Sequence, residues 1–382
     1  MNISDYQVCS NCGACYNICP HQAITLDKQS TFYTPVVDAA KCVQCGLCYE
    51  RCPVNNDLMP LVPGSAWAGW HKDRKVVSGS SSGGAFHGFA RSVLDEGGVV
   101  FGAVYSDDCR EVIFASSDEV GFEKMQKSKY VESLPGMCFS RIKKELSGGR
   151  KVLFCGTPCQ VAGLKAFLGR EWEQLITCDF ACGGLPSHKI YQDYLSGLER
   201  KYKSEAVSVD FRPKTHGWKL YAVLVKFRNK KVYNRLGRED PYLHSFLYGK
   251  CTVRDACLEC KFSDNHQSDL TIADFWLHDR LSGLENREGI SLILCNTEKG
   301  SALIRKIKSQ YMLEEMPVSD VAYNNKKTVA SPEERQSHDA VVAHFEENGF
   351  LSAYRKQYPF SLKDAVKNHM RRIARKTRGR NQ

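Results

Sequence analysis

The chain has 382 residues, of which 42% are hydrophobic, so it is long enough for two or three globular domains and is not predominantly disordered. The formal net charge is +10, but residues 363–380 hold eight Lys/Arg and one Asp, which leaves the remainder nearly balanced and disfavours a nucleic-acid-binding face. No apolar run approaches the roughly 20 residues of a membrane span, and the first residues lack a secretory signal pattern. We therefore expect a cytoplasmic protein.

The 18 cysteines are the most informative feature of the composition. In a reducing compartment, clustered cysteines are more often metal ligands or redox groups than disulfides. Eight of them form two matching runs, C-x2-C-x2-C-x3-C-P, that start at Cys9 and Cys42. This spacing is typical of ferredoxins with two [4Fe–4S] clusters, in which the last cysteine of each run ligates the other cluster.

The sequence therefore predicts two ligand sets within residues 1–60. One set is Cys9, Cys12, Cys15 and Cys52, and the other is Cys42, Cys45, Cys48 and Cys19. Two zinc ribbons are the alternative, but zinc sites use separated C-x2-C pairs rather than runs of four. Gly13 and Gly46 suit the tight ligand loops, where a Cβ would crowd the cluster.

A Pro/Gly-containing linker at 60–64 leads into a different pattern. A Ser/Gly-rich loop at 78–84 precedes a predicted helix at 85–96 and a predicted buried strand at 99–105. Free backbone N–H groups at a helix start suit a phosphate, although such loops are more often plain helix caps.

A second strand–turn–helix unit follows, with a strand at 151–155 and a helix at 159–168. Cys159 falls in the first helical turn, where the helix dipole is expected to lower its pKa and favour a thiolate. A third strand at 175–181 leads to Cys182, and the pair Cys257 and Cys260 is expected in a loop before a strand at 268–273.

These four cysteines are candidate ligands of a third cluster, because they follow strands or lie in loops. The alternative is that they are buried structural cysteines, which are common in protein cores. Cys109, Cys138 and Cys295 have no close partners in the sequence and are interpreted as core or surface thiols.

Together these segments resemble the beta subunit family of coenzyme F420-reducing hydrogenase and dehydrogenase, in the variant with an N-terminal ferredoxin. The resemblance rests on residues 78–86, 127–133, 153–168, 179–187, 211–219 and 256–276. It implies a bound FAD beside one [4Fe–4S] cluster, with Cys159, Cys182, Cys257 and Cys260 as its ligands. It also implies that flavin contacts come from Ser81, Ser82, Gly83, Gly84, Lys129, Thr157 and Gln160.

The chain also departs from the family pattern. The usual Cys-His-Gly reads Cys182-Gly183-Gly184 here, so any role of that histidine is absent. Cys155, Cys178 and Cys251 are additional, and the first two lie four residues before ligand candidates, which leaves a different ligand set open.

The expected fold is α+β, with a ferredoxin-like domain followed by an α/β flavin-binding body. The expected divisions are 1–60 for the dicluster domain, 61–150 and 151–318 for the two parts of the body, and 319–382 for a helical, basic extension. The basic tail is either an amphipathic helix that contacts a membrane or a partner, or a solvated terminus.

The sequence favours an iron–sulfur flavoprotein oxidoreductase. It would move electrons between ferredoxin-type clusters and a flavin that exchanges hydride with F420 or another small metabolite. Reduced ferredoxin or a similar carrier is the expected electron partner. The alternatives are an electron-transfer subunit that feeds a separate catalytic partner and, less favoured, a nucleic-acid-associated iron–sulfur protein.

Overall fold

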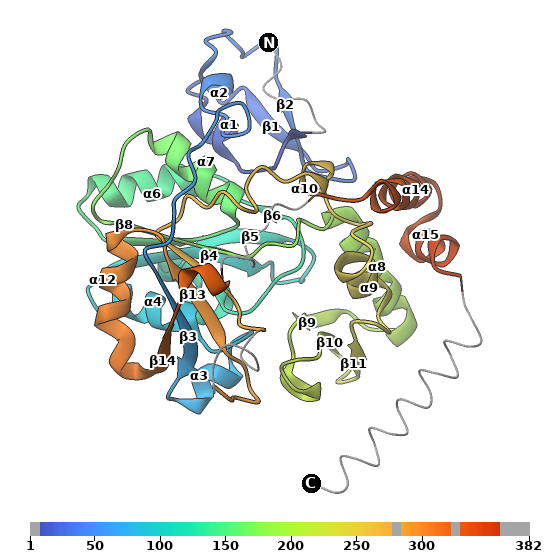
Figure 1. The fold of residues 1–382 in the computed structure, drawn as a ribbon. Coiled ribbons are helices and arrows are strands. Elements are labelled where there is room, and N and C mark those ends of the chain that lie inside the picture. The colour runs from blue at the N-terminus through green and yellow to red at the C-terminus, as the bar shows by residue number, and fades with distance from the viewer. Residues whose placement is uncertain (1–7, 277–283, 322–328, 360–382) are drawn as a thin grey trace, which may run out of the picture.

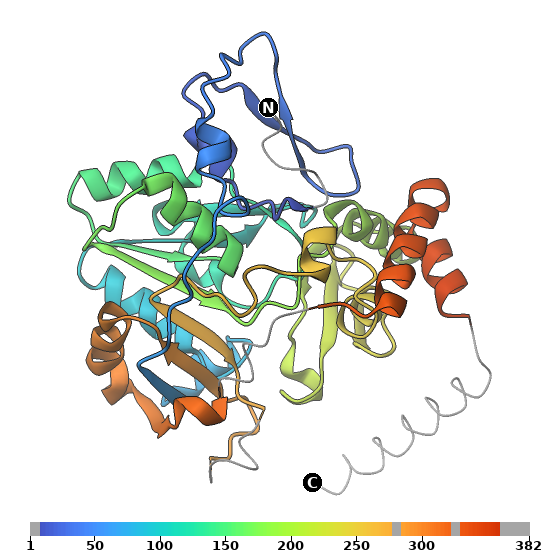
Figure 2. The ribbon, with the colours of Figure 1, turned by 45° about the horizontal axis from the view of Figure 1, so that its top comes forward.

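The computed structural model describes residues 8–276, 284–321 and 329–359 (Figure 1). The basic tail lies outside these residues. A small N-terminal domain sits on a larger body, and the two views show it contacting the body on one side (Figures 1 and 2). Within the described residues, no helix combines the length and the apolar character that crossing a membrane requires.

The N-terminal domain contains two cysteine loops and one antiparallel strand pair. Its elements are α1 (Ala14–Ile18), β1 (Ile24–Asp27), β2 (Thr34–Val37) and α2 (Leu47–Glu50). Gly13 and Gly46 precede the two helices with φ of 92° and 80°, in the left-handed region that glycine tolerates. A Cβ on Gly13 would lie 2.9 Å from the Cβ of Pro135, so the body itself requires a glycine there.

The body is built on a nine-stranded sheet with the order β14-β3-β13-β12-β8-β7-β4-β5-β6. These strands are β3 (Ser65–His71), β4 (Val99–Tyr105), β5 (Val112–Ser116), β6 (Ser133–Leu134), β7 (Val152–Cys155), β8 (Leu175–Phe180), β12 (Leu270–Asp274), β13 (Ser291–Cys295) and β14 (Tyr311–Met316). β4, β7, β8 and β12 are parallel neighbours. β3 points the same way, because β13 is antiparallel to both β12 and β3.

Helices cover both faces of this sheet because successive strand residues point to opposite sides. Val100 and Val104 of β4 pack with α4 (Ala85–Leu94) and α12 (Glu298–Ile307), whereas Val99 and Phe101 pack with α6 (Cys138–Ser147) and α7 (Pro158–Leu168). The shorter elements here are α3 (Arg74–Ser78), α5 (Ser117–Val120), η2 (Phe122–Met125), η4 (Lys308–Gln310) and α13 (Val318–Val321).

A second lobe has its own three-stranded antiparallel sheet and a separate, tyrosine-rich core. Its elements are α8 (His188–Tyr202), β9 (Ala206–Asp210), η3 (Lys214–His216), β10 (Ala222–Phe227), β11 (Val232–Leu236), α9 (Pro241–Leu247), α10 (Asp255–Leu258), α14 (Pro332–Asn348) and α15 (Phe350–Gln357).

The predicted strands and helices of the body are present with small differences at their ends. The helix predicted at 85–96 ends at Leu94, and the strand predicted at 99–105 has those bounds. The predicted loop around Cys257 is wrong in part, because the short helix α10 carries that residue. Residue 150 is the expected division within the body, and strands before it, such as β4, and after it, such as β7, belong to the same sheet.

Candidate iron–sulfur and cofactor sites

The predicted ligands and flavin contacts of the body are arranged along one edge of the large sheet. Parallel strands end at a common edge, which is where α/β folds place ligand sites. Cys155 and Asp274 end β7 and β12 at this edge. Cys159 begins α7 just beyond β7, and Cys182 follows β8 by two residues.

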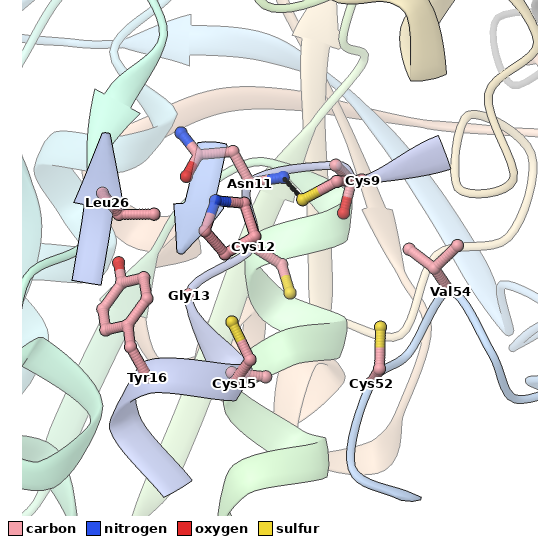
Figure 3. A pocket seen from close by; sticks show the side chains of 12 residues that line it. Cys9, Asn11, Cys12, Gly13, Cys15, Tyr16, Leu26, Cys52 and Val54 are labelled. Atoms are coloured by element: carbon pink, nitrogen blue, oxygen red, sulfur yellow. Dashed lines mark hydrogen bonds between the residues drawn. The ribbon is translucent and has the colours of Figure 1, made fainter. Parts of the chain in front are cut away.

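Cys9, Cys12, Cys15 and Cys52 surround one hollow in the N-terminal domain. Figure 3 shows their sulfur atoms pointing into the same space. The backbone N–H of Asn11 donates to the sulfur of Cys9 at 3.5 Å. Burial raises the pKa of the Cys12 and Cys15 thiols, so thiolates there need cationic iron close by. The donor set and its surroundings fit an iron–sulfur cluster.

Cys19, Cys42, Cys45 and Cys48 surround a second hollow. The N–H of Ala23 donates to the sulfur of Cys19 at 3.4 Å, another contact that suits a metal-bound sulfur. Each hollow thus contains three cysteines of one run and the last cysteine of the other. The structure brings together the same two groups that the sequence proposes as ligand sets.

Cys159, Cys182, Cys257 and Cys260 form a third group at the edge of the large sheet. The Cys257 thiol interacts electrostatically with the other three, and burial raises the pKa of all four thiols. The N–H groups of Leu185 and Phe262 donate to the sulfurs of Cys257 and Cys260, each at 3.4 Å. Four mutually close, hydrogen-bonded sulfurs fit a further cluster.

The expected effect of the helix dipole on Cys159 is wrong. Burial raises the pKa of its thiol to about 12, and the hydrogen bond with Thr157, 3.0 Å between Oγ1 and Sγ, only partly opposes this. Desolvation therefore outweighs the helix dipole at this position.

The first and third cysteine groups lie directly against each other. A Cβ on Gly163 of α7 would be 2.9 Å from the Cβ and 3.0 Å from the sulfur of Cys12. The sulfur of Cys159 lies 3.8 Å from the carbonyl oxygen of Ser10, and Cys12, Cys159 and Cys257 share one buried cluster. The absence of a side chain at position 163 allows this close approach.

A buried charged network fixes the N-terminal domain on the body. The Arg254 guanidinium donates to the carbonyl oxygens of Cys9 at 2.7 Å and Tyr33 at 2.8 Å, and to the Glu132 carboxylate at 3.1 Å. Glu132 also lies 2.7 Å from Nδ1 of His188, whose ring stacks on Tyr33 with centroids 3.6 Å apart. We call these side chains, Arg254, Glu132 and His188, the interdomain network. No sequence motif predicts it.

The Ser81–Gly84 loop is fixed mainly by the protein itself. Ser82 Oγ donates to the carbonyl oxygen of Ile290 at 2.7 Å, and the N–H of Gly83 donates to Ser291 Oγ at 2.9 Å. A Cβ on Gly83 would lie 2.3 Å from the carbonyl oxygen of Gly69. Packing alone therefore explains this glycine, and the Gly83 N–H is already paired.

Cationic and aromatic side chains nevertheless gather beside this loop. Lys214 Nζ donates to the carbonyl oxygen of Ser82 at 3.0 Å, and the buried Arg212 pairs with Asp274 at 2.7 Å. The indole N–H of Trp218 donates to Asp274 at 3.1 Å, and its ring stacks on Trp276 with centroids 4.8 Å apart. Such a set fits a cofactor with a flat ring and a phosphate.

The other three predicted flavin contacts support neighbouring backbone and side chains. Lys129 Nζ donates to three carbonyl oxygens, the shortest bond being 2.9 Å to Gln126. Thr157 and Gln160 form the capping box of α7, and Gln160 Nε2 also donates to Ser133 Oγ at 2.9 Å. These contacts stabilise the fold around the third cysteine group.

The fold and its cysteine hollows define an iron–sulfur protein with a ferredoxin-like domain on a mixed α/β body. Residues 8–56 match the 4Fe-4S dicluster domain, and residues 149–321 match the C terminus of the coenzyme F420 hydrogenase/dehydrogenase beta subunit. These two matches confirm the resemblance seen in the sequence, to the beta subunit family in the form with an N-terminal dicluster domain.

Two individual proteins are similar to this chain. Coenzyme F420-dependent sulfite reductase of Methanocaldococcus jannaschii is 24% identical over 308 residues, which cover 79% of this chain and 46% of that protein. The chain therefore spans less than half of this relative. A chain of the xenon-derivatized F420-reducing [NiFe] hydrogenase complex from Methanosarcina barkeri aligns with a TM-score of 0.49 and 15% identity, over 75% of this chain and 94% of that one.

Proposed function

We propose that the protein is an iron–sulfur flavoprotein oxidoreductase that passes electrons between its dicluster domain and a flavin at the edge of the large sheet. The observation that carries this proposal is the contact between the first and third cysteine groups at Gly163 and Cys12. Electron transfer between cofactors needs short separations and a fixed geometry, and the interdomain network supplies the second requirement.

In this proposal a [4Fe–4S] cluster occupies each of the three cysteine groups. Along the electron path that leads to the flavin, the order of the groups is second, first and third. The dicluster domain spans residues 1–60, the body spans 61–318, and residues 319–382 form an extension. A flavin, when bound, exchanges hydride with an organic partner and passes the electrons singly to clusters. F420 or another small metabolite is the proposed hydride partner, and reduced ferredoxin or a similar carrier is the proposed electron partner.

We place FAD beside Ser81–Gly84, with Lys129, Thr157 and Gln160 nearer to the third cluster. The supporting observation is the set of cationic and aromatic groups around the loop, since Arg212 and Lys214 suit a phosphate and Trp218 suits a flat ring. These side chains orient and neutralise the cofactor.

A second candidate is an electron-transfer subunit that serves a separate catalytic partner. It is favoured by the coverage of the sulfite reductase, more than half of which lies outside the matched region. The two candidates separate when the anaerobic, reconstituted chain is mixed with reduced ferredoxin and F420. Turnover by the chain alone supports the oxidoreductase, whereas reduction of bound flavin without turnover of F420 or other soluble acceptors supports the electron-transfer role.

The cluster count can be measured directly. Anaerobic protein is expected to hold about twelve irons, because each cubane contains four. Replacing Cys257 by alanine should lower the content to about eight, since the Cys257 thiol lies close enough to the other three thiols of its group to interact with them electrostatically. Cys138→Ala, which removes a buried cysteine of a helix packed on the sheet, is the matched control and should keep all twelve. Equal iron in both variants would contradict the third cluster.

The flavin site can be tested by reversing one charge. Lys214→Glu should lose most of the FAD, because it places a carboxylate where Lys214 now binds the Ser82 carbonyl. Lys231→Glu changes an exposed lysine of the same lobe and is the control. Flavin and iron are both quantified after anaerobic purification, and iron should stay constant. Full flavin retention by Lys214→Glu would place the cofactor elsewhere.

A further inference from the structure

Two cysteines at the edge of the large sheet have no role in the three proposed clusters. Cys155 ends β7, and its register partner on the parallel strand β8 is Cys178. Cys155 lies close enough to Cys178 that their interaction, together with burial, raises the pKa of the Cys178 thiol. Cys178 is fully buried, whereas Cys155 is half-buried at the end of its strand.

This placement suits a disulfide. Neighbouring strands lie about 4.8 Å apart, and bridged cysteines have Cα atoms about 4.4–6.8 Å apart. Register partners also direct their side chains to the same face of the sheet. Both cysteines belong to the core that α4 and α12 cover. No large backbone movement is therefore needed to join them.

The surroundings of Cys155 differ from those of the isolated cysteines. The half-buried Lys129 ammonium interacts electrostatically with Cys155, and reactive cysteines occur in such electropositive, partly exposed settings. By contrast, Cys138 is almost fully buried among the side chains of α6 and α7, and Cys251 is hydrogen-bonded to Tyr358. One cysteine of the pair is thus accessible, and its resolving partner lies beside it.

We propose that Cys155 and Cys178 form a redox-active dithiol at the electron-transfer edge of the sheet. With a small disulfide as oxidant, the Cys155 sulfur attacks it, forms a mixed disulfide and releases one thiol. Cys178 then attacks the Cys155 sulfur and gives up its proton, and the second thiol leaves. One S–S bond breaks in the oxidant and one forms in the protein, with two electrons and two protons transferred to the oxidant.

The capacity of this pair to cycle does not depend on FAD. The proposed function enters only in the identity of the electron acceptor inside the protein, which would be a two-electron flavin at the same edge of the sheet. A dithiol there would store two electrons next to a path that carries them singly. Loss of flavin therefore tests the proposed function, whereas the thiol state tests this inference.

The experiment follows the thiols of the anaerobic holoprotein across a series of oxidised-to-reduced dithiothreitol ratios. Samples are quenched in acid, alkylated and digested with trypsin and endoproteinase AspN, which cuts before Asp179 and separates Cys178 from Cys182. The expected product is a disulfide between peptide 152–165 and peptide 171–178, which appears as the ratio rises and disappears on reduction.

Three variants decide the assignment. Cys155→Ser and Cys178→Ser should each abolish the linked peptide while keeping the full iron content, and Cys138→Ser should leave it unchanged. Since peptide 152–165 also contains Cys159, persistence of the link in Cys155→Ser would overturn the proposal. Loss of about four irons in Cys155→Ser would also overturn it, because the cysteine would then be a cluster ligand. Absence of the link at every ratio would do the same.

Discussion

Replacing Arg254 by methionine is expected to destabilise the protein by about 3–5 kcal/mol, because it leaves the buried Glu132 carboxylate without its cation. Both side chains are almost completely buried, at 2% and 0% exposure. The same change removes the hydrogen bonds to the carbonyl oxygens of Cys9 and Tyr33, so the dicluster domain should also be held less firmly. Urea denaturation of the anaerobic holoprotein, followed by cluster absorbance, measures the effect.

A matched control is available on the surface. Arg228 pairs with Glu205, and both side chains are largely exposed, at 73% and 72%. Arg228→Met should therefore cost less than about 1 kcal/mol. The double variant Arg254→Met/Glu132→Met should be less destabilised than the sum of its single changes, because neither charge is then left alone. Similar denaturation midpoints for Arg254→Met and Arg228→Met would show that the network does not hold the domains together.

Replacing Gly163 by leucine is expected to slow electron transfer between the dicluster domain and the body at least tenfold. Any Cβ there meets the Cβ and the sulfur of Cys12. A longer side chain must therefore push the loop that carries Cys12 away from α7. Rapid mixing with reduced ferredoxin measures how fast the flavin is reduced. Reduction by dithionite, a small donor that reaches the body directly, should change little.

The control for this variant lies two residues further along the same helix. Lys165 makes only a 3.4 Å ion pair with a largely exposed Glu171, so Lys165→Leu adds the same side chain without touching the cluster loop. Iron content should be measured in both variants, because a Gly163→Leu protein that lacks iron would show cluster loss instead of a longer path. If both variants reduce flavin at the rate of the parent protein, electrons do not pass from Cys12 to α7.

The cysteine groups of the N-terminal domain could be predicted because their geometry is local. Spacings of two and three residues determine which sulfurs can face one iron cluster, and the matching runs imply the exchange of the last cysteine. The strands ending at Tyr105 and Cys155 were likewise visible as short apolar runs. The order of the nine strands was not, because pairing depends on side chains far apart in the chain.

The interdomain network shows a different limit. Arg254, Glu132 and His188 are charged or polar residues that composition assigns to the surface, and no periodicity marks them as buried. Glu132 lies inside a segment used for the family resemblance, which was the available signal, but its partner is 122 residues away. The expected low pKa of the Cys159 thiol is wrong for a related reason. This thiol is buried by the dicluster domain and α10, and not by its own helix.

The two cysteine hollows of the N-terminal domain differ in their access to solvent, and therefore in their exposure to small dissolved oxidants. The first is enclosed by the body, with Cys12 and Cys52 buried, whereas Cys45 of the second is exposed. Val43 and Tyr49, at 59% and 46% exposure, line the second hollow. For the proposed clusters, we therefore expect dissolved oxygen to reach the second cysteine group before the first, so exposure to air should release iron from the second group first.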